Sequence, residues 1–185
     1  MNLNRNLNRI LTAFVAALTV AALTVAALSA TARAQGGPGE QYTDPNGYFT
    51  VTLPANWGAR PYPAQSFQSF ALNAGPADGS MGMSVWVFPG VQSAEAAIGQ
   101  LRGWVGSNRG RMNWHEQAPV NSGGRQYRQF FGDTAYDQGG AWDWINFVRS
   151  FQGGTVIVTI AAPKGHLIAV MPQLRQVFNT FDPGG

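Results

Sequence analysis

Residues 141–161 read AWDWINFVRSFQGGTVIVTIA, and this stretch decides the fold. Two segments rich in β-branched and aromatic residues, roughly 141–151 and 155–161, flank the pair Gly153-Gly154. This spacing is typical of a β-hairpin, because glycine adopts the positive φ values that a tight turn needs. We therefore expect two long antiparallel strands joined by a turn at 152–154.

Further strands are predicted on both sides of this hairpin. The segment YFTVTL at 48–53 alternates strictly between apolar and polar residues, which is the pattern of a half-buried strand. A weaker strand pattern lies at 66–73, and further strands are predicted at 81–88, 114–120 and 125–133. Asp44-Pro45-Asn46-Gly47 precedes the first strand with turn-forming residues at each position.

Two segments change to helical periodicity. Ser93 is a good N-cap, and an apolar stripe follows it at Ala97, Ile98, Leu101, Trp104 and Val105. A second stripe consists of Leu167, Met171, Leu174, Phe178 and Phe181. Pro172 lies inside it, which predicts either a kink or a helix that begins at Pro172. The order of elements predicts an α+β fold, in which helices pack on a largely antiparallel sheet of about six or seven strands.

The N-terminal residues have the pattern of an export signal. Arg5 and Arg9 form a positive region, residues 10–30 are apolar, and Ala32-Arg33-Ala34 fits a small-x-small cleavage site. We therefore predict a signal peptide at 1–34, a Gly/Pro linker at 35–41 and a single domain at 42–183. The protein is expected to be periplasmic or secreted after cleavage near Ala34-Gln35, without a stable membrane anchor.

Charge and cysteine content exclude several classes of function. Three of the twelve basic residues precede residue 35, whereas all nine acidic residues follow it, so the cleaved chain is formally neutral. It lacks the basic surface that a nucleic-acid partner requires. Cysteine is absent, which excludes disulfides, thiolate metal sites and a cysteine nucleophile. No cofactor is expected, because no phosphate-binding glycine motif is present.

Three stretches resemble the PsbP-like and DcrB-like exported protein family. They are NGYFTVTLPANW at 46–57, SAEAA at 93–97 and LRQVFNTF at 174–181. The family shares a fold among the photosystem II protein PsbP, the nuclear-transport factor Mog and bacterial exported DcrB-like proteins. The resemblance implies an α/β/α sandwich. It implies no catalytic residues, and function does not follow from a shared fold.

Candidate chemical groups are few. His115 and His166 are too far apart in sequence for a metal-ligand pair, and strand alternation sends His115 and Glu116 to opposite faces. A carboxylate pair for glycoside hydrolysis would have to come from the acidic residues Glu116, Asp133, Asp137 and Asp143, and their spacing does not require it. We assign no catalytic, metal or cofactor residues.

Trp142 and Trp144 are the most distinctive local feature. In a strand they share one face, which is either a stacking platform for a sugar, a base or an apolar side chain, or part of the core beneath a helix. The sequence therefore leaves two functional hypotheses open. The first is a non-enzymatic protein that binds an envelope or secreted protein. The second is a small-ligand or glycan binder, or a hydrolase, that uses the Trp142/Trp144 face.

Overall fold

The structure is a computed structural model that describes residues 39–62, 70–108, 110–137 and 139–184. All of the described elements belong to one compact unit, residues 36–185. The predicted signal peptide lies outside the described residues, and so does most of the predicted linker. Within that linker, Glu40 and Gln41 already form the start of a strand.

Two antiparallel sheets and two helices form this unit. The seven-stranded sheet has the order β3-β4-β5-β9-β8-β7-β6, and the three-stranded sheet has the order β1-β2-β10. The strands are β1 (Glu40–Thr43), β2 (Phe49–Leu53), β3 (Trp57–Pro61), β4 (Phe70–Pro76), β5 (Gly82–Pro89), β6 (Gly110–Ser122), β7 (Arg125–Tyr136), β8 (Ala141–Phe151), β9 (Gly154–Pro163) and β10 (Asp182–Pro183). The helices are α2 (Ala94–Ser107) and α3 (Leu167–Asn179). The predicted α+β fold is confirmed.

The hairpin that the sequence emphasises lies near the centre of the larger sheet. Strands β8 and β9 pair along their whole length, from Trp142 opposite Pro163 to Phe151 opposite Gly154. Gly154 has a φ of 153°, and a Cβ atom at this position would collide with the carbonyl oxygen of Phe88 on β5. Glycine is therefore required where three strands approach one another at the turn.

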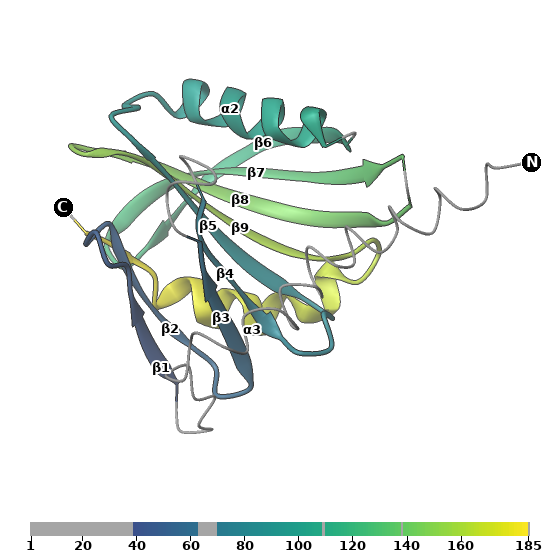
Figure 1. Cartoon of the computed structure of the whole chain (residues 1–185), viewed down its shortest axis with the longest axis horizontal. Coiled ribbons are helices and arrows are strands. Elements are labelled where there is room, and N and C mark those ends of the chain that lie inside the picture. The colour runs from purple at the N-terminus through teal and green to yellow at the C-terminus, as the bar shows by residue number, and fades with distance from the viewer. Residues whose placement is uncertain (1–38, 63–69, 109, 138, 185) are drawn as a thin grey trace, which may run out of the picture. The chain divides into compact units, whose positions relative to one another are not determined.

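The two helices cover opposite faces of the seven-stranded sheet, as Figure 1 shows. Side chains alternate along the central strand β9: Val156 and Val158 lie in the cluster beneath α3, and Ile157 lies in the cluster beneath α2. A strand that is buried on both faces is almost continuously hydrophobic, which explains the sequence TVIVTIA. We call the two faces the α2 side and the α3 side.

Several element boundaries differ from the expectation. Trp57 begins a strand, β3, which the sequence patterns did not predict. Helix α3 begins at Leu167 and continues past Pro172, so the alternative of a helix that begins at Pro172 is wrong. Pro172 lies on the exposed side of α3, where water can satisfy the carbonyl group that loses its N–H partner.

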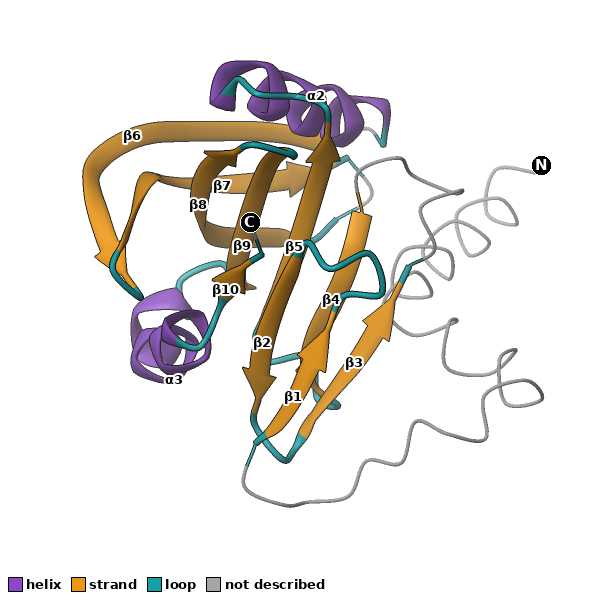
Figure 2. Ribbon diagram, turned by 90° about the vertical axis from the view of Figure 1, so that its left-hand side faces the viewer, coloured by secondary structure: helices purple, strands orange, loops and turns teal. Residues whose placement is uncertain are grey.

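Strand β6 is the longest strand and lies at one edge of the sheet. Its pairing with β7 shifts register between Gln117 and Val120, at a segment that contains Pro119. Proline is tolerated there because an edge strand has backbone groups that face solvent. Figure 2 shows the strong bend of β6. None of the helices in the described part of the chain has the length and hydrophobicity needed to cross a membrane.

Candidate functional site

The two tryptophans of the predicted platform differ in burial. Trp144 is only 3% exposed, and it lies in the α2-side cluster. Its indole N–H donates to Thr134 Oγ1 at 2.9 Å, and its ring packs edge-on against Trp114. Gly132 leaves room for this ring, because a Cβ atom there would lie 2.7 Å from Trp144. Trp142 is half-buried. Trp144 is thus a core residue, and a binding role for the pair stays a prediction.

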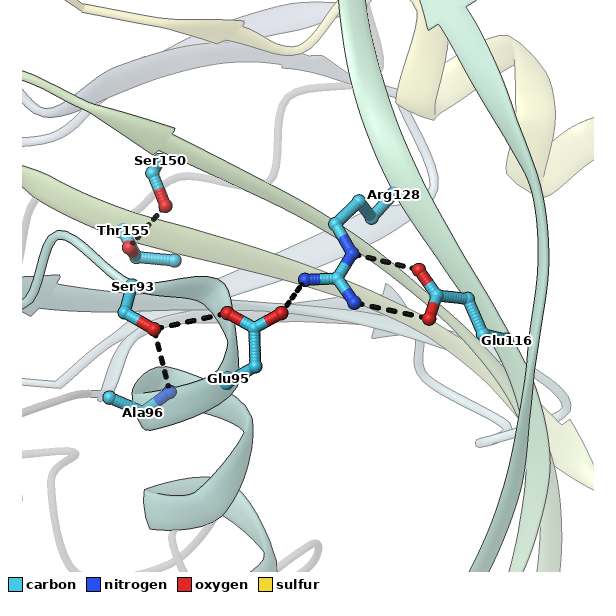
Figure 3. A network of polar contacts seen from close by, with 7 residues as sticks. All are labelled: Ser93, Glu95, Ala96, Glu116, Arg128, Ser150 and Thr155. Atoms are coloured by element: carbon cyan, nitrogen blue, oxygen red, sulfur yellow. Dashed lines mark hydrogen bonds and ion pairs between the residues drawn. The ribbon is translucent and has the colours of Figure 1, made fainter.

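Polar contacts join the first turn of α2 to the sheet (Figure 3). Ser93 caps the helix, because its Oγ accepts from the Ala96 N–H at 3.3 Å. Arg128 on β7 donates to Glu116 on β6 at 2.8 and 3.1 Å and also contacts Glu95 on α2. These hydrogen bonds lower the pKa of both carboxyl groups and raise the pKa of Arg128. The network therefore holds two carboxylates ionised beside one guanidinium.

The other candidate carboxylates also have structural partners. Asp133 and Asp143 lie opposite each other on β7 and β8. Asp133 accepts from Lys164 Nζ at 2.7 Å, and the pKa of its carboxyl group is lowered chiefly by that hydrogen bond. Asp143 accepts from the Gly165 N–H at 2.6 Å, and Asp137 pairs with Arg111 at 3.4 Å. A glycosidase acid needs a raised pKa, which neither Asp133 nor Glu116 has.

The two histidines lie apart from any group of ligands. His115 is exposed on β6, and His166 occupies the N-cap position of α3 without a capping side-chain bond. Within the described ranges, no three side chains of the metal-binding types are grouped.

An exposed apolar surface lies on the α3 side. Among the described residues, Phe131 on β7 and Ile168 on α3 are the large apolar side chains with the highest exposure, at 39% and 84%. Phe131 lies opposite the buried Ile145, and half-buried Met171 lies one turn after Ile168. We call Phe131, Ile168 and Met171 the α3-side apolar surface.

Contacts near the two ends of α3 give its direction relative to β7. Strand β7 and helix α3 run in opposite directions, since Tyr127 packs on Phe178 at one end and Asp133 bonds Lys164 at the other. Phe131 is two residues from Asp133 and Ile168 is four residues from Lys164, so both lie toward this end of the sheet and helix. The sequence holds one signal for this surface: Ile168 is apolar but lies off the stripe of buried residues on α3.

Comparison with known proteins bears on the fold. No protein-family model matches the chain, and no curated protein matches it in sequence. Among solved structures, the cyanobacterial PsbP protein CyanoP of Synechocystis sp. PCC 6803 matches with a TM-score of 0.56 and 10% identity, over 78% of this chain and 91% of CyanoP. The chain has a PsbP-like fold.

Two further structures are similar. A protein of Bacteroides thetaiotaomicron VPI-5482 has a TM-score of 0.51 and 14% identity, and the match covers 80% of this chain but only 50% of that protein. LpqN of Mycobacterium tuberculosis, which is involved in cell envelope biogenesis, has a TM-score of 0.46 and 10% identity over 81% of this chain and 87% of LpqN. At such low identities the similarity shows the PsbP-like fold alone.

The sequence stretches that suggested the PsbP-like fold have structural roles. Phe49 on β2 stacks on Phe181 at 5.4 Å, which joins the first and last of these stretches. Thr180 Oγ1 accepts from the Thr52 N–H at 2.9 Å and donates to the Thr52 carbonyl at 3.1 Å. Trp57 is buried. The predicted motifs of the PsbP-like fold therefore hold the three-stranded sheet and α3 together.

Proposed function

We propose that this protein is exported and acts, without catalysis, by binding another protein of the cell envelope or the secreted fraction. The observation that carries this proposal is the α3-side apolar surface. Single exposed apolar residues are common, whereas Phe131 and Ile168 come from different elements and both lie toward the end where Asp133 bonds Lys164. Large apolar side chains of this kind provide much of the binding energy in protein interfaces.

The surroundings of this surface also fit binding better than chemistry. The nearby carboxylates of Asp133 and Asp143 already accept hydrogen bonds from Lys164 and from the backbone of Gly165. Hydrogen-bonded polar groups around an apolar centre form the polar rim that is usual in protein interfaces. After export and removal of the predicted signal peptide, this surface would lie in the periplasm or the medium, where we expect the partner.

Site-specific photo-crosslinking tests the proposal. A photoreactive amino acid is placed at Ile168, at Phe131 or, as a control, at Gln176, another exposed position on α3. The whole chain is expressed with its signal in the native host, and adducts are identified by mass spectrometry. We expect the same heterologous adduct from positions 168 and 131, and none from position 176.

Two other outcomes would contradict the proposal. An adduct of two copies of the processed chain would show self-association instead of a separate partner. The absence of an adduct from both apolar positions would contradict an interface at this surface. The variant Ile168→Ser completes the test, because a side chain that is 84% exposed adds little to stability. It should lose the partner and keep the unfolding midpoint of the wild type.

Export is tested separately by determining the N-terminal sequence of the protein that is recovered outside the cytoplasm. We expect a mature protein that begins at Gln35. A protein that retains residues 1–34 would contradict the predicted cleavage.

A further inference from the structure

A row of polar side chains crosses the α2 side of the seven-stranded sheet. Its members lie on five neighbouring strands and face one another in register: Arg60 on β3, Asn73 on β4, Ser84 on β5, Thr159 on β9 and Asn146 on β8. Directly opposite residues of antiparallel strands project from the same face. Asn146 lies between Trp144 and Val148, which belong to the α2-side cluster, so the whole row is on that side. We call these five residues the polar row.

The inner end of the polar row holds a buried amide that is not satisfied. Asn146 is 0% exposed, and its Oδ1 accepts from Thr159 Oγ1 at 2.6 Å. Its Nδ2 has no hydrogen-bond partner within the described part of the chain. A buried donor without a partner destabilises the folded state, so such a group in a folded protein calls for an explanation.

The rest of the row is open to solvent. Arg60, Asn73, Ser84 and Thr159 are all half-buried. Helix α2 packs mainly on β6, β8 and β9, and its Trp104 also reaches Trp86 on β5. Ser84 Oγ lies 3.5 Å from Asn73 Oδ1, which is a weak hydrogen bond and leaves both groups able to bind something else. The row therefore leads from solvent to the unsatisfied amide of Asn146.

Small residues lie along one side of the polar row. Two positions from the row lie Gly58 on β3, Gly75 on β4, Gly82 on β5 and Ala161 on β9, whereas the corresponding residue on β8 is Trp144. Gly58 faces Gly75, Gly82 faces Ala161, and a Cβ atom on Gly75 would lie 3.4 Å from the Gly82 Cα. Because these residues have no large side chains, a ligand can approach the backbone of the sheet there.

Indole rings lie along the other side. Trp86 on β5 is two residues from Ser84, and the ring of Trp104 on α2 packs edge-on against it with centroids 5.0 Å apart. The row thus combines amides and hydroxyls, which both donate and accept, with an apolar border in which Trp86 is 7% exposed and Trp104 is half-buried. Binding sites commonly join such apolar walls to a few converging polar groups.

We propose that the polar row is the binding site of a neutral oligosaccharide, separate from the protein-binding surface on the α3 side. Sugar hydroxyls donate and accept as the row does, and the C–H faces of sugar rings pack on indoles. Five strands at a spacing of about 4.8 Å give the row a length of roughly 19 Å, which favours an elongated ligand. Asn146 is fully buried, so a sugar oxygen supplies the acceptor that its Nδ2 lacks once neighbouring side chains move aside.

The composition of the row argues against other ligands. It contains a single cationic side chain, Arg60, so it lacks the cluster of cations that a phosphate-rich ligand requires. It contains no carboxylate, which a divalent cation requires. An acyl chain would leave its amides and hydroxyls without partners.

A glycan array tests the proposal, with protein that is produced from the whole chain and purified after processing. The array carries neutral, amino and acidic oligosaccharides, and the best ligand is then titrated by calorimetry. We expect a neutral oligosaccharide to bind, and its monosaccharide to bind at least 10-fold more weakly. No binding across the array, or binding of acidic glycans alone, would overturn the proposal.

Variants locate the binding site. The double change Asn73→Ala with Ser84→Ala should weaken binding at least 10-fold. Thr50→Val is the matched control, because Thr50 is a half-buried hydroxyl residue on β2 of the other sheet. An equal loss in both variants, or no loss in the double variant, would contradict binding at the polar row.

A variant that adds a side chain beside the polar row separates an effect on binding from an effect on folding. At Gly82 a Cβ atom would lie 3.5 Å from its nearest neighbour, the Ala74 carbonyl oxygen, which is an ordinary contact. Valine is favourable in strands, so Gly82→Val should keep or raise the unfolding midpoint while it blocks the sheet surface beside the row. Oligosaccharide binding at wild-type strength in a folded Gly82→Val protein would overturn the proposal.

Discussion

The α3 side of the seven-stranded sheet buries a larger apolar cluster than the α2 side. The α3-side cluster gathers residues from both sheets and from α3, and all of its members are apolar or aromatic. The α2 side has a smaller cluster of buried apolar residues, and Thr134, Asn146 and Thr155 are buried on the same face. One face thus provides most of the hydrophobic stabilisation, and the other contains polar groups that are available for specific contacts.

The largest expected difference between the faces is in cavity formation. Leu174 on α3 and Leu101 on α2 are both buried leucines. We expect Leu174→Ala to lower the free energy of unfolding by about 4 kcal/mol and Leu101→Ala by about 2 kcal/mol, because the larger cluster leaves a less collapsible cavity. Urea denaturation of both variants measures the difference. Equal losses, or a larger loss at Leu101, would refute the contrast between the two faces.

A second prediction concerns the polar contact that the α2 side buries. Thr159→Val removes the donor to Asn146 Oδ1 and should cost about 1–3 kcal/mol, since it leaves that oxygen buried without a partner. The double change Thr159→Val with Asn146→Val removes both polar partners and should restore most of the loss. A double-mutant cycle by denaturation measures this coupling. Additive losses would mean that the two side chains act independently.

The helix caps differ between the two faces. Ser93 caps α2 through its side chain, whereas His166 gives α3 no side-chain cap. Ser93→Ala should therefore cost about 1 kcal/mol. His166→Ala should cost less than Ser93→Ala. Thermal unfolding of the two variants tests the ranking, and a reversed order would show that capping is not what anchors the start of α2.

The smallest effect is expected from the ion pairs of Arg128. Arg128 lowers the pKa of Glu95 and Glu116, so their contribution to stability is present above the ordinary carboxyl pKa of about 4.3 and is lost as the pH falls below it. These groups are exposed and screened by solvent, so the contribution is small.

The pH dependence of unfolding measures this contribution. Between pH 7 and pH 3, the unfolding midpoint of Arg128→Gln should fall less than that of the wild type. Arg175→Gln is the control, because Arg175 forms no ion pair with a carboxylate among the described residues. Parallel curves for wild type and Arg128→Gln would show that the network does not stabilise the fold.

Local patterns predicted most of the elements. Alternation located the central strands, and the Gly153-Gly154 turn identified the hairpin of β8 and β9. Ser93 marked the start of α2, and the bond to the Ala96 N–H confirms it. Strand β3 was missed, because Trp57-Gly58-Ala59-Arg60-Pro61 has no clear alternation and pairs only with β4. Its pairing depends on a neighbour that the local sequence does not identify.

The candidate surfaces were harder to predict. Phe130 and Phe131 are neighbours in sequence, yet Phe130 is buried on the α2 side and Phe131 is exposed on the α3 side. Alternation places them on opposite faces, but it does not say which face a helix covers at that point. Trp142 and Trp144 were correctly assigned to one face, and only the position of α2 makes Trp144 a core residue.

The sequence by itself therefore determined the type of fold, the main hairpins, the helix start at Ser93 and an N-terminal pattern typical of export, because these depend on residues close together in the chain. Tertiary structure decided which face α2 and α3 cover and where Phe131 and Ile168 remain exposed. It also decided that Arg60, Asn73, Ser84, Thr159 and Asn146 form one row. Strand order and register bring these five residues together from positions up to about a hundred residues apart, and local periodicity carries no information about such pairings.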